Sequence, residues 1–407
     1  MVPQEAIYVS NHLKVQKYSP IQLSFVPWFG SNAKLKGLQT NFLSMNILAG
    51  YSGGLCGLEI GGLANIIQNN ASGVQVGGLT NIVNGNTNGV QIGGILNYNF
   101  GYLNGVQFGG IGNISLDTTS GIQVGGIFNI NKGHIAGLQI GGITNINSGS
   151  VKGVQISGIY NFTPSIGGVQ IAGIMNTSNV KMNGVQVAGI SNFASSTKGV
   201  QVSGIINLSS GNVAGMQIAG IVNKAKILNG VQLGIINIAD SIENGLQFGL
   251  FNIVKNGYRA FEFTTNETYS FDFLYKTGGK KLYSILNIGV DKNEVGAGYG
   301  LGLIQPMFTN LSASVDGIST AMLVTNAQNT YQGQKISIRI ALNYDFYKHL
   351  GVTTGVSFNF FNPYHDSEIS TSANELTFSG NSNKLITQSI QANQKTAWIG
   401  WFVGIRL

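Results

Sequence analysis

Ionisable side chains that could carry out acid–base chemistry are sparse in this chain of 407 residues. Over residues 57–257 the acidic residues are Glu59, Asp117, Asp240 and Glu243. A hydrolytic pair of carboxylates would have to come from these four, brought together in one cleft. Glu59 and Asp117 belong to distant segments, and the other two share one predicted turn. The sequence therefore predicts no catalytic residues and no enzyme.

The histidines and the glycine-rich segments also lack the motifs of metal and cofactor sites. His12, His134, His349 and His365 lack the spacing of zinc ligands, and His365 stands beside Asp366 in a predicted loop. A calcium-binding solenoid would need an aspartate in each repeat, which is not the pattern here. The sequence contains no P-loop. We therefore predict neither a metal site nor a bound cofactor.

Amides are the polar groups that recur. One glutamine row repeats every 15 or 16 residues, with Glu59 at its first position. We predict that it points outward, which makes it a candidate contact row that could hydrogen-bond a linear polymer such as a glycan. The alternative is a solvated ladder that favours parallel stacking. The row comprises Gln75, Gln91, Gln107, Gln123, Gln139, Gln155, Gln170, Gln186, Gln201, Gln217, Gln232 and Gln247.

An asparagine row follows at the same period. A side-chain amide repeated in every coil can donate to its neighbour's carbonyl group, which satisfies buried polar groups. We therefore predict a structural asparagine ladder, with a glycan-binding row as the alternative. The row comprises Asn65, Asn81, Asn97, Asn113, Asn129, Asn145, Asn161, Asn176, Asn192, Asn207, Asn223, Asn237 and Asn252.

Both rows belong to one internal repeat, G-[VLIM]-Q-[VILF]-[GAS]-G-[IL]-x-N. Its first six steps are 16 residues long, and the later steps are 15 or 16. The thirteen copies begin at Gly57, Gly73, Gly89, Gly105, Gly121, Gly137, Gly153, Gly168, Gly184, Gly199, Gly215, Gly230 and Gly245.

A repeat of this length predicts one coil of a β-solenoid. In GVQVGGLTNIV, the residues Val74 and Val76 share one strand face, and Gln75 lies on the other. A bend at the glycine pair lets the coil bury both valines together with Leu79 and Ile82, and leaves Gln75 outside. About thirteen such coils would stack at about 4.8 Å. The alternative is one large antiparallel β-barrel, which the constant spacing of the early repeats disfavours.

The position before each asparagine varies, which predicts that it faces outward. Its apolar members could contact a partner, a barrel or a second chain. In the first nine copies with this pattern it is occupied by Thr80, Leu96, Gly112, Phe128, Thr144, Tyr160, Met175, Ser191 and Ile206.

Composition agrees with an ordered all-β chain. Charged residues make up 9%, against roughly 25% in an average soluble domain. Glycine is frequent, with 59 residues, and 43% of the chain is hydrophobic. The net charge is +7, but the lysines are scattered, which argues against a nucleic-acid partner.

Strict alternation replaces the repeat towards the C-terminus, as in residues 336–346 and 352–360. The last strand places Ile399, Trp401, Val403, Ile405 and Leu407 on one face. Such segments suit an outer-membrane-type antiparallel barrel, with a soluble sandwich as the alternative. We predict that residues 1–51 contribute two barrel strands, that residues 52–257 form the solenoid, and that residues 258–407 complete the barrel.

The GVQxGGIxN array, preceded by QLSFVPWFGSN and NFLSMNILAGYSGG, resembles a family of repeat-containing surface proteins of Gram-negative bacteria. The resemblance covers nearly the whole chain. It implies an outer-membrane or cell-surface location and no established activity. Residues 1–16 do not have the pattern of a secretory signal.

Together these features predict a non-enzymatic outer-membrane surface protein. The barrel would anchor the chain in outer-membrane lipid, and the solenoid would be a rigid surface for adhesion or for contact with an extracellular protein or glycan. Two alternatives stay open. One is an outer-membrane pore or transport-associated barrel, and the other is a soluble or trimeric adhesin-like head.

Overall fold

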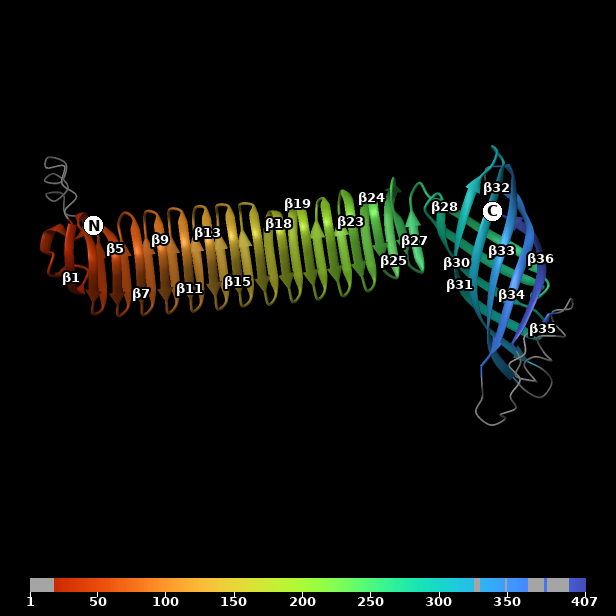
Figure 1. The fold of residues 1–407 in the computed structure, drawn as a ribbon, viewed down its shortest axis with the longest axis horizontal. Helices are drawn as coiled ribbons and strands as arrows, with labels where there is room; N and C mark the ends of the chain where they lie inside the picture. Colours follow the sequence, from red (N-terminus) through yellow and green to blue (C-terminus); the bar gives the residue numbers. More distant parts are fainter. Residues whose placement is uncertain (1–17, 326–329, 348–349, 365–376, 379–394) are drawn as a thin grey trace. The chain divides into compact units, whose positions relative to one another are not determined.

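The computed structural model describes residues 18–325, 330–347, 350–364, 377–378 and 395–407. It contains a β-solenoid of about 13 turns and a closed eight-stranded antiparallel barrel (Figure 1). The predicted all-β fold is thus confirmed, and the alternative of one large barrel is wrong. The chain divides into two compact units, Met1–Gly220 and Ile221–Leu407.

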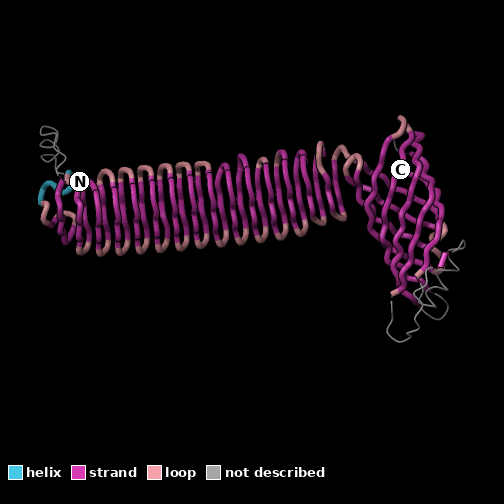
Figure 2. The backbone as a smooth tube through the Cα atoms, in the orientation of Figure 1, coloured by secondary structure: helices cyan, strands magenta, loops and turns pink. Residues whose placement is uncertain are grey.

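Each solenoid coil consists of a long strand, a tight corner, a short strand and a polar turn (Figure 2). Long strands pair in parallel with long strands one repeat away, and short strands pair with short strands. The pairing is in register, so that Gln75 lies beside Gln91 and Asn81 beside Asn97.

The long strands of the first unit have similar bounds: β5 (Gly54–Gly61), β7 (Ala71–Gly77), β9 (Thr87–Gly93), β11 (Leu103–Gly109), β13 (Thr119–Gly125), β15 (Ile135–Gly141), β17 (Val151–Ser157), β21 (Thr197–Ser203) and β23 (Asn212–Ala219). The short strands are β6 (Ala64–Ile67), β8 (Thr80–Val83), β10 (Leu96–Asn99), β12 (Gly112–Ser115), β14 (Phe128–Asn131), β16 (Thr144–Asn147), β20 (Ser191–Ala194) and β22 (Ile206–Ser209). Strands β18 (Tyr160–Ala172) and β19 (Met175–Ala188) continue through the polar turn. The second unit begins with coil strands β24 (Val222–Leu233), β25 (Ile236–Ile242), β26 (Leu246–Phe248) and β27 (Phe251–Val254).

The N-terminal strands belong to the solenoid and not to the barrel, which corrects the prediction for residues 1–51. β1 (Tyr18–Val26) pairs in parallel with β3 (Thr40–Asn46), and β3 pairs with β5. β2 (Phe29–Gly30), the 3-10 helix η1 (Ala33–Leu38) and β4 (Ala49–Ser52) complete this end. Alternation is common to barrel and solenoid strands, so the sequence pattern alone did not distinguish them.

All eight barrel strands lie C-terminal to the repeats. They are β28 (Tyr258–Asn266), β29 (Phe271–Gly278), β30 (Leu282–Val290), β31 (Glu294–Pro306), β32 (Leu311–Thr325), β33 (Thr330–Tyr347), β34 (Leu350–Pro363) and β36 (Thr396–Arg406). Neighbours in this order pair antiparallel, and β28 closes the barrel against β36. The two-residue strand β35 (Thr377–Phe378) pairs with β36.

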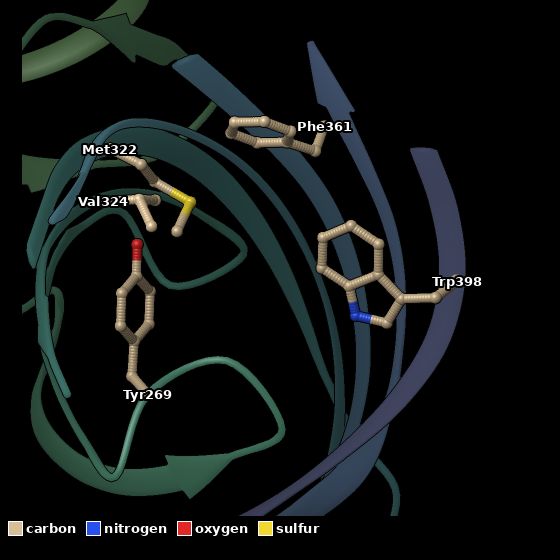
Figure 3. Close-up of a cluster of buried hydrophobic side chains, with 5 residues drawn as sticks. All are labelled: Tyr269, Met322, Val324, Phe361 and Trp398. Carbon is tan, nitrogen blue, oxygen red and sulfur yellow. The ribbon is translucent and has the colours of Figure 1, made fainter. Parts of the chain in front are cut away.

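The barrel has an apolar outer face and a mixed interior. Ile399, Trp401, Val403, Ile405 and Leu407 are all exposed, which confirms that they share one face. Inside, five buried side chains form a hydrophobic cluster (Figure 3): Tyr269, Met322, Val324, Phe361 and Trp398.

In the solenoid the predicted orientation of the coil is wrong. Val74, Val76 and Ile82 are only half-buried and face outward, and Leu79 is 42% exposed. Gln75, predicted to lie outside, is 1% exposed. Alternation places Gln75 opposite the valines but leaves open which face lies inside, and the prediction assumed an apolar interior.

Close stacking of the coils requires glycine at the second position of each glycine pair. A Cβ on Gly126 would lie 2.0 Å from the carbonyl oxygen of Gly110 in the preceding coil. The first position is more tolerant, because Ala172 and Ala188 occupy it in later coils. The corner glycine therefore sets how closely adjacent coils approach.

We predict that Gly126→Ala lowers the free energy of unfolding by about 1–3 kcal/mol or more, because the added methyl group has to push two coils apart. Gly167→Ala, where an added Cβ would come no closer than 3.8 Å to the neighbouring coil, is the matched control and should lower the unfolding free energy less. Urea unfolding in detergent, followed by far-ultraviolet circular dichroism, measures both. Equal losses for the two variants would contradict this account of the stacking.

Candidate functional site

The asparagine row lies inside the solenoid and forms a hydrogen-bonded ladder. Asn81 Nδ2 donates to Asn97 Oδ1 at 2.9 Å and to the carbonyl oxygen of Ile92 at 2.8 Å. The same pattern recurs along the row, including the donation from Asn237 to Asn252 in the second unit. These side chains are buried, so the structure places them in a structural role and leaves no surface row for a glycan.

The glutamine row is also buried, which corrects its prediction as an outward contact row. Gln91 Nε2 donates to Gln75 Oε1 at 2.9 Å, and Gln139 Nε2 donates to Gln123 Oε1 at 2.8 Å. Pairing of neighbouring amides satisfies most of the buried polar atoms of the row, and Gln247 Oε1 at its C-terminal end is left without a partner among the described residues. Because the row lies within the coils, it cannot meet an external polymer. The corrected positions are Gln75, Gln91, Gln107, Gln123, Gln139, Gln155, Gln170, Gln186, Gln201, Gln217, Gln232 and Gln247.

The two ladders donate in opposite directions along the solenoid, and this explains the acid at the head of the glutamine row. Glutamine amides donate towards the N-terminus, and asparagine amides donate towards the C-terminus. Glu59 accepts from Gln75 Nε2 at 3.0 Å and from Asn46 Nδ2 at 3.2 Å. A carboxylate only accepts, so it suits a position where both neighbours donate.

Burial raises the pKa of the Glu59 carboxyl above its ordinary value, and the hydrogen bonds from Gln75, Asn46, Ser44 and Ser52 oppose that shift. The site is enclosed, with the side chain fully buried. Glu59 therefore completes a ladder, and the structure does not bring it together with another acid to form a catalytic pair.

At its far end the asparagine ladder continues into the barrel. Within the second unit, Asn252 Nδ2 donates to the hydroxyl of Ser284 on β30. Ser284 donates to the carbonyl oxygen of Gly249 at 2.8 Å, and the Tyr299 hydroxyl donates to the same oxygen at 3.0 Å. Polar side chains of β30 and β31 thus cap the last coil.

The barrel interior holds a buried ion-pair network that sequence reasoning missed. Lys276 Nζ lies 2.7 Å from Asp316 Oδ2 and 2.8 Å from Glu262 Oε2. The Tyr283 hydroxyl donates to Asp316. The signal was present in the sequence, because these residues occupy the strand positions that alternate with the apolar outer row. Paired charges of this kind are tolerated inside because each has a partner.

A second buried group fills the other part of the interior. Arg339 lies 3.3 Å from Asp272 Oδ2 and stacks over the Phe402 ring, 3.8 Å from its centroid. Glu267, from the β28–β29 connection, accepts from Asn359 at 2.8 Å and from Trp398 at 3.2 Å. The cavity beside these residues measures about 20 Å³, room for about one water molecule.

The remaining predicted acids are exposed, Asp117 and Glu243 in turns and Asp240 on strand β25. Glu243 accepts from Asn229. His134 Nδ1 lies 2.8 Å from the hydroxyl of Ser150. Within the described residues, no three histidine, cysteine or acidic side chains gather as a metal site would require.

Some of the sequence candidates cannot be placed. His12, His349, His365 and Asp366 lie outside the described residues. The variable position before each ladder asparagine does lie on the outer surface, half-buried between neighbouring coils at most copies and buried at Gly112 and Ser191.

Comparisons with known proteins found no match. No family model matches this chain, and no similar curated protein or solved structure was found. Among the helices of the described residues, none has the length and apolar character needed to cross a membrane.

We predict that Gln139→Ala destabilises the solenoid. Gln139 Oε1 accepts from Gln155 at 2.9 Å and from Asn147 at 2.8 Å, so truncation leaves two buried donors unpaired. The expected loss in unfolding free energy is about 1–3 kcal/mol for each donor. Lys152→Ala, in an exposed position of the neighbouring coil, should change it by less than about 0.5 kcal/mol. If Gln139→Ala lowered the unfolding free energy as little as Lys152→Ala does, the glutamine would be on the surface and the assignment would be wrong.

Glu59 should make the solenoid less stable as pH rises. Its folded-state pKa is raised, so the folded chain holds the proton more tightly than the unfolded chain. This contribution is complete below the unfolded value of about 4.5 and is lost as pH rises through the folded value. Glu59→Gln should remove that part of the pH dependence in urea titrations. Asp117→Asn, an exposed control, should keep it, and an unchanged dependence in Glu59→Gln would refute the assignment.

Proposed function

We propose that this chain is a non-enzymatic outer-membrane surface protein of a Gram-negative bacterium. The barrel would anchor it in lipid and the solenoid would be carried as a rigid module. The observation that carries the proposal is how the barrel sorts its side chains. Apolar groups face outward, and paired charges face inward.

The sorting extends over the whole barrel. On β33 the residues Ile336, Ile338, Ile340 and Leu342 are exposed, whereas Lys335, Ser337, Arg339 and Asn343 alternate with them and are buried. Among the described barrel-strand residues, Arg259 near the start of β28 is the charged side chain that is exposed on the outer face. In water this arrangement would expose a large apolar surface, but in lipid it is the favourable one.

The filled interior supports an anchor more than a pore. Ion pairs, aromatic rings and a water-sized cavity occupy the space inside eight strands. Barrels of this size have interiors that side chains fill. The pore alternative also required the repeats to be barrel strands, and they are solenoid coils.

The solenoid suits a presentation role because it is rigid and regular. Within each unit, the amide ladders and parallel pairing fix each coil on the next. With the glutamine row inside, the polar surface available for contact with a protein or glycan is the edge of exposed turns, such as residues 84–86 and 148–150. That edge carries side chains that vary from coil to coil.

We predict that Ile338→Lys blocks assembly in the membrane. Ile338 lies near the middle of β33 and is 50% exposed on the outer face. Placing a lysine at the lipid midplane should cost about 2–4 kcal/mol. Insertion into phosphatidylcholine vesicles, measured by protease resistance, and detergent-dependent extraction from cells provide the readouts.

Gln332→Lys is the matched control, because Gln332 is exposed near the start of the same strand. Near the interface the cost of lysine falls to about 0–1 kcal/mol, so this variant should insert normally. If Ile338→Lys inserts equally well, or if the unchanged chain is released without detergent, the barrel is not an anchor and the soluble adhesin-like head is favoured.

A further inference from the structure

We propose that one edge of the solenoid is itself embedded in a lipid surface. This goes beyond a barrel anchor, and it rests on the proposed function only in that the barrel brings the chain to a membrane. The surface in question, here called the apolar edge, is the row of corner residues that follow the glycine pairs. In the first unit it comprises Leu48, Leu63, Leu79, Ile95, Ile111, Ile127, Ile143, Ile159, Ile174, Ile190 and Ile205.

Every member of the apolar edge is leucine or isoleucine and is exposed, as Ile127 is at 41%. The outward positions on both flanking strands extend the same surface. Beside Ile127 they are Ile122 and Val124 on β13 and Ile130 on β14. The apolar surface therefore wraps around the corner and continues onto both faces of the coil stack. Contiguous exposed apolar surface of this extent indicates an interaction site.

Charged side chains in the coils of the first unit lie away from the apolar edge. Lys132 and Asp117 lie in the polar turns at the opposite end of the coil, and Lys152 and Lys198 lie in the first positions after those turns. Glu59 is enclosed within the ladder. The coil stack is thus amphipathic across its width, as expected of an element that lies in a membrane interface.

The backbone N–H groups of the apolar edge are paired within the coil stack. Ile111 N donates to the carbonyl oxygen of Ile95 at 2.9 Å, Ile127 N to that of Ile111 at 2.7 Å, and Ile143 N to that of Ile127 at 2.8 Å. In lipid, polar backbone groups have to be paired within the protein. Stacking of the coils pairs the corner N–H groups, whereas the N–H groups of an isolated loop would need water as a partner.

The shape of the surface favours lipid over a second copy of the chain. The apolar edge is a convex ridge, and two such ridges would touch along a line and leave both flanking faces uncovered. Fluid acyl chains can cover a ridge and its two flanks together. The sorting of side chains also favours lipid. The coils bury their amide rows beside small apolar clusters, such as Ile135 with Val151, and expose rows of apolar side chains as the barrel does.

The N-terminal end carries further exposed residues suited to an interface. Trp28, between β1 and β2, is 81% exposed, and Phe29 is 70% exposed. Ile47 takes the place of a corner glycine and is also exposed. Tryptophan is enriched at membrane–water interfaces because its ring is apolar and its N–H can remain hydrated.

The test measures the depth of single labels on the full chain. Cys56, the sole cysteine, is exposed and is first replaced by serine. Ile127→Cys then probes the apolar edge, Lys132→Cys the polar turn, and Ile338→Cys the outer face of the barrel. Each variant is labelled with an environment-sensitive dye and inserted into phosphatidylcholine vesicles that contain acyl-chain nitroxides. Ile159→Cys, at the same place two coils away, provides a second probe should Ile127→Cys fold poorly.

Labels at 127 and 338 should shift to the blue and lose most of their fluorescence to the nitroxide, whereas the label at 132 should behave as in water. Quenching at 338 but not at 127 would overturn this inference and leave the barrel anchor standing. Loss of quenching at 338 would overturn the anchor as well. Disulfide formation between two copies through position 127, without quenching, would instead assign the apolar edge to a second copy.

Discussion

The register of side-chain amides from coil to coil is the constraint on which the solenoid depends. A slip of one residue would turn the buried glutamines and asparagines outward and place valines inside, leaving the amides of the adjacent coil unpaired. The uneven repeat length shows how firmly this register is kept. Asn161 bonds to Asn176 over 15 residues, and Asn223 bonds to Asn237 over 14. The difference in length is absorbed away from the ladders, as in the register shift between Thr163 and Ser165.

A polar interior would be costly if any amide were left alone, and the ends of the ladders show how this is largely avoided. Glutamines and asparagines donate in opposite directions, so the N-terminal end of the glutamine row needs an acceptor. Glu59 is this acceptor for Gln75, and it also accepts a hydrogen bond from Asn46. At the C-terminal end of the asparagine row, Ser284 of the barrel accepts a hydrogen bond from Asn252. The N-terminal end of the glutamine row and the C-terminal end of the asparagine row are thus paired, whereas Gln247 Oε1 at the other end of the glutamine row has no hydrogen-bond partner in the described part of the chain.

Both structural units place polar groups inside and apolar groups outside. In the barrel the inner groups include ion pairs such as Lys276 with Asp316, and in the coils they are uncharged amides beside small apolar clusters such as Ile135 with Val151. Both arrangements would be unfavourable in water, because they expose isoleucine and valine side chains over long surfaces. The proposed membrane anchor and the proposed lipid-embedded edge both follow from this one property. They differ in depth, because the barrel would span the lipid and the coils would lie at its surface.

The sequence by itself determined the repeat, the parallel register, the tight glycine corners and the alternating barrel strands, because each leaves a periodic trace in residue type. It also indicated an asparagine ladder, since an amide recurring at one place in every coil can pair with the next. Only the tertiary structure decided which face of each coil lies inside, because the alternation of Gln75 with Val74 and Val76 reads the same in both orientations. The tertiary structure likewise assigned residues 18–52 to the solenoid and paired Lys276 with Glu262 and Asp316. Those contacts join segments that no local pattern connects.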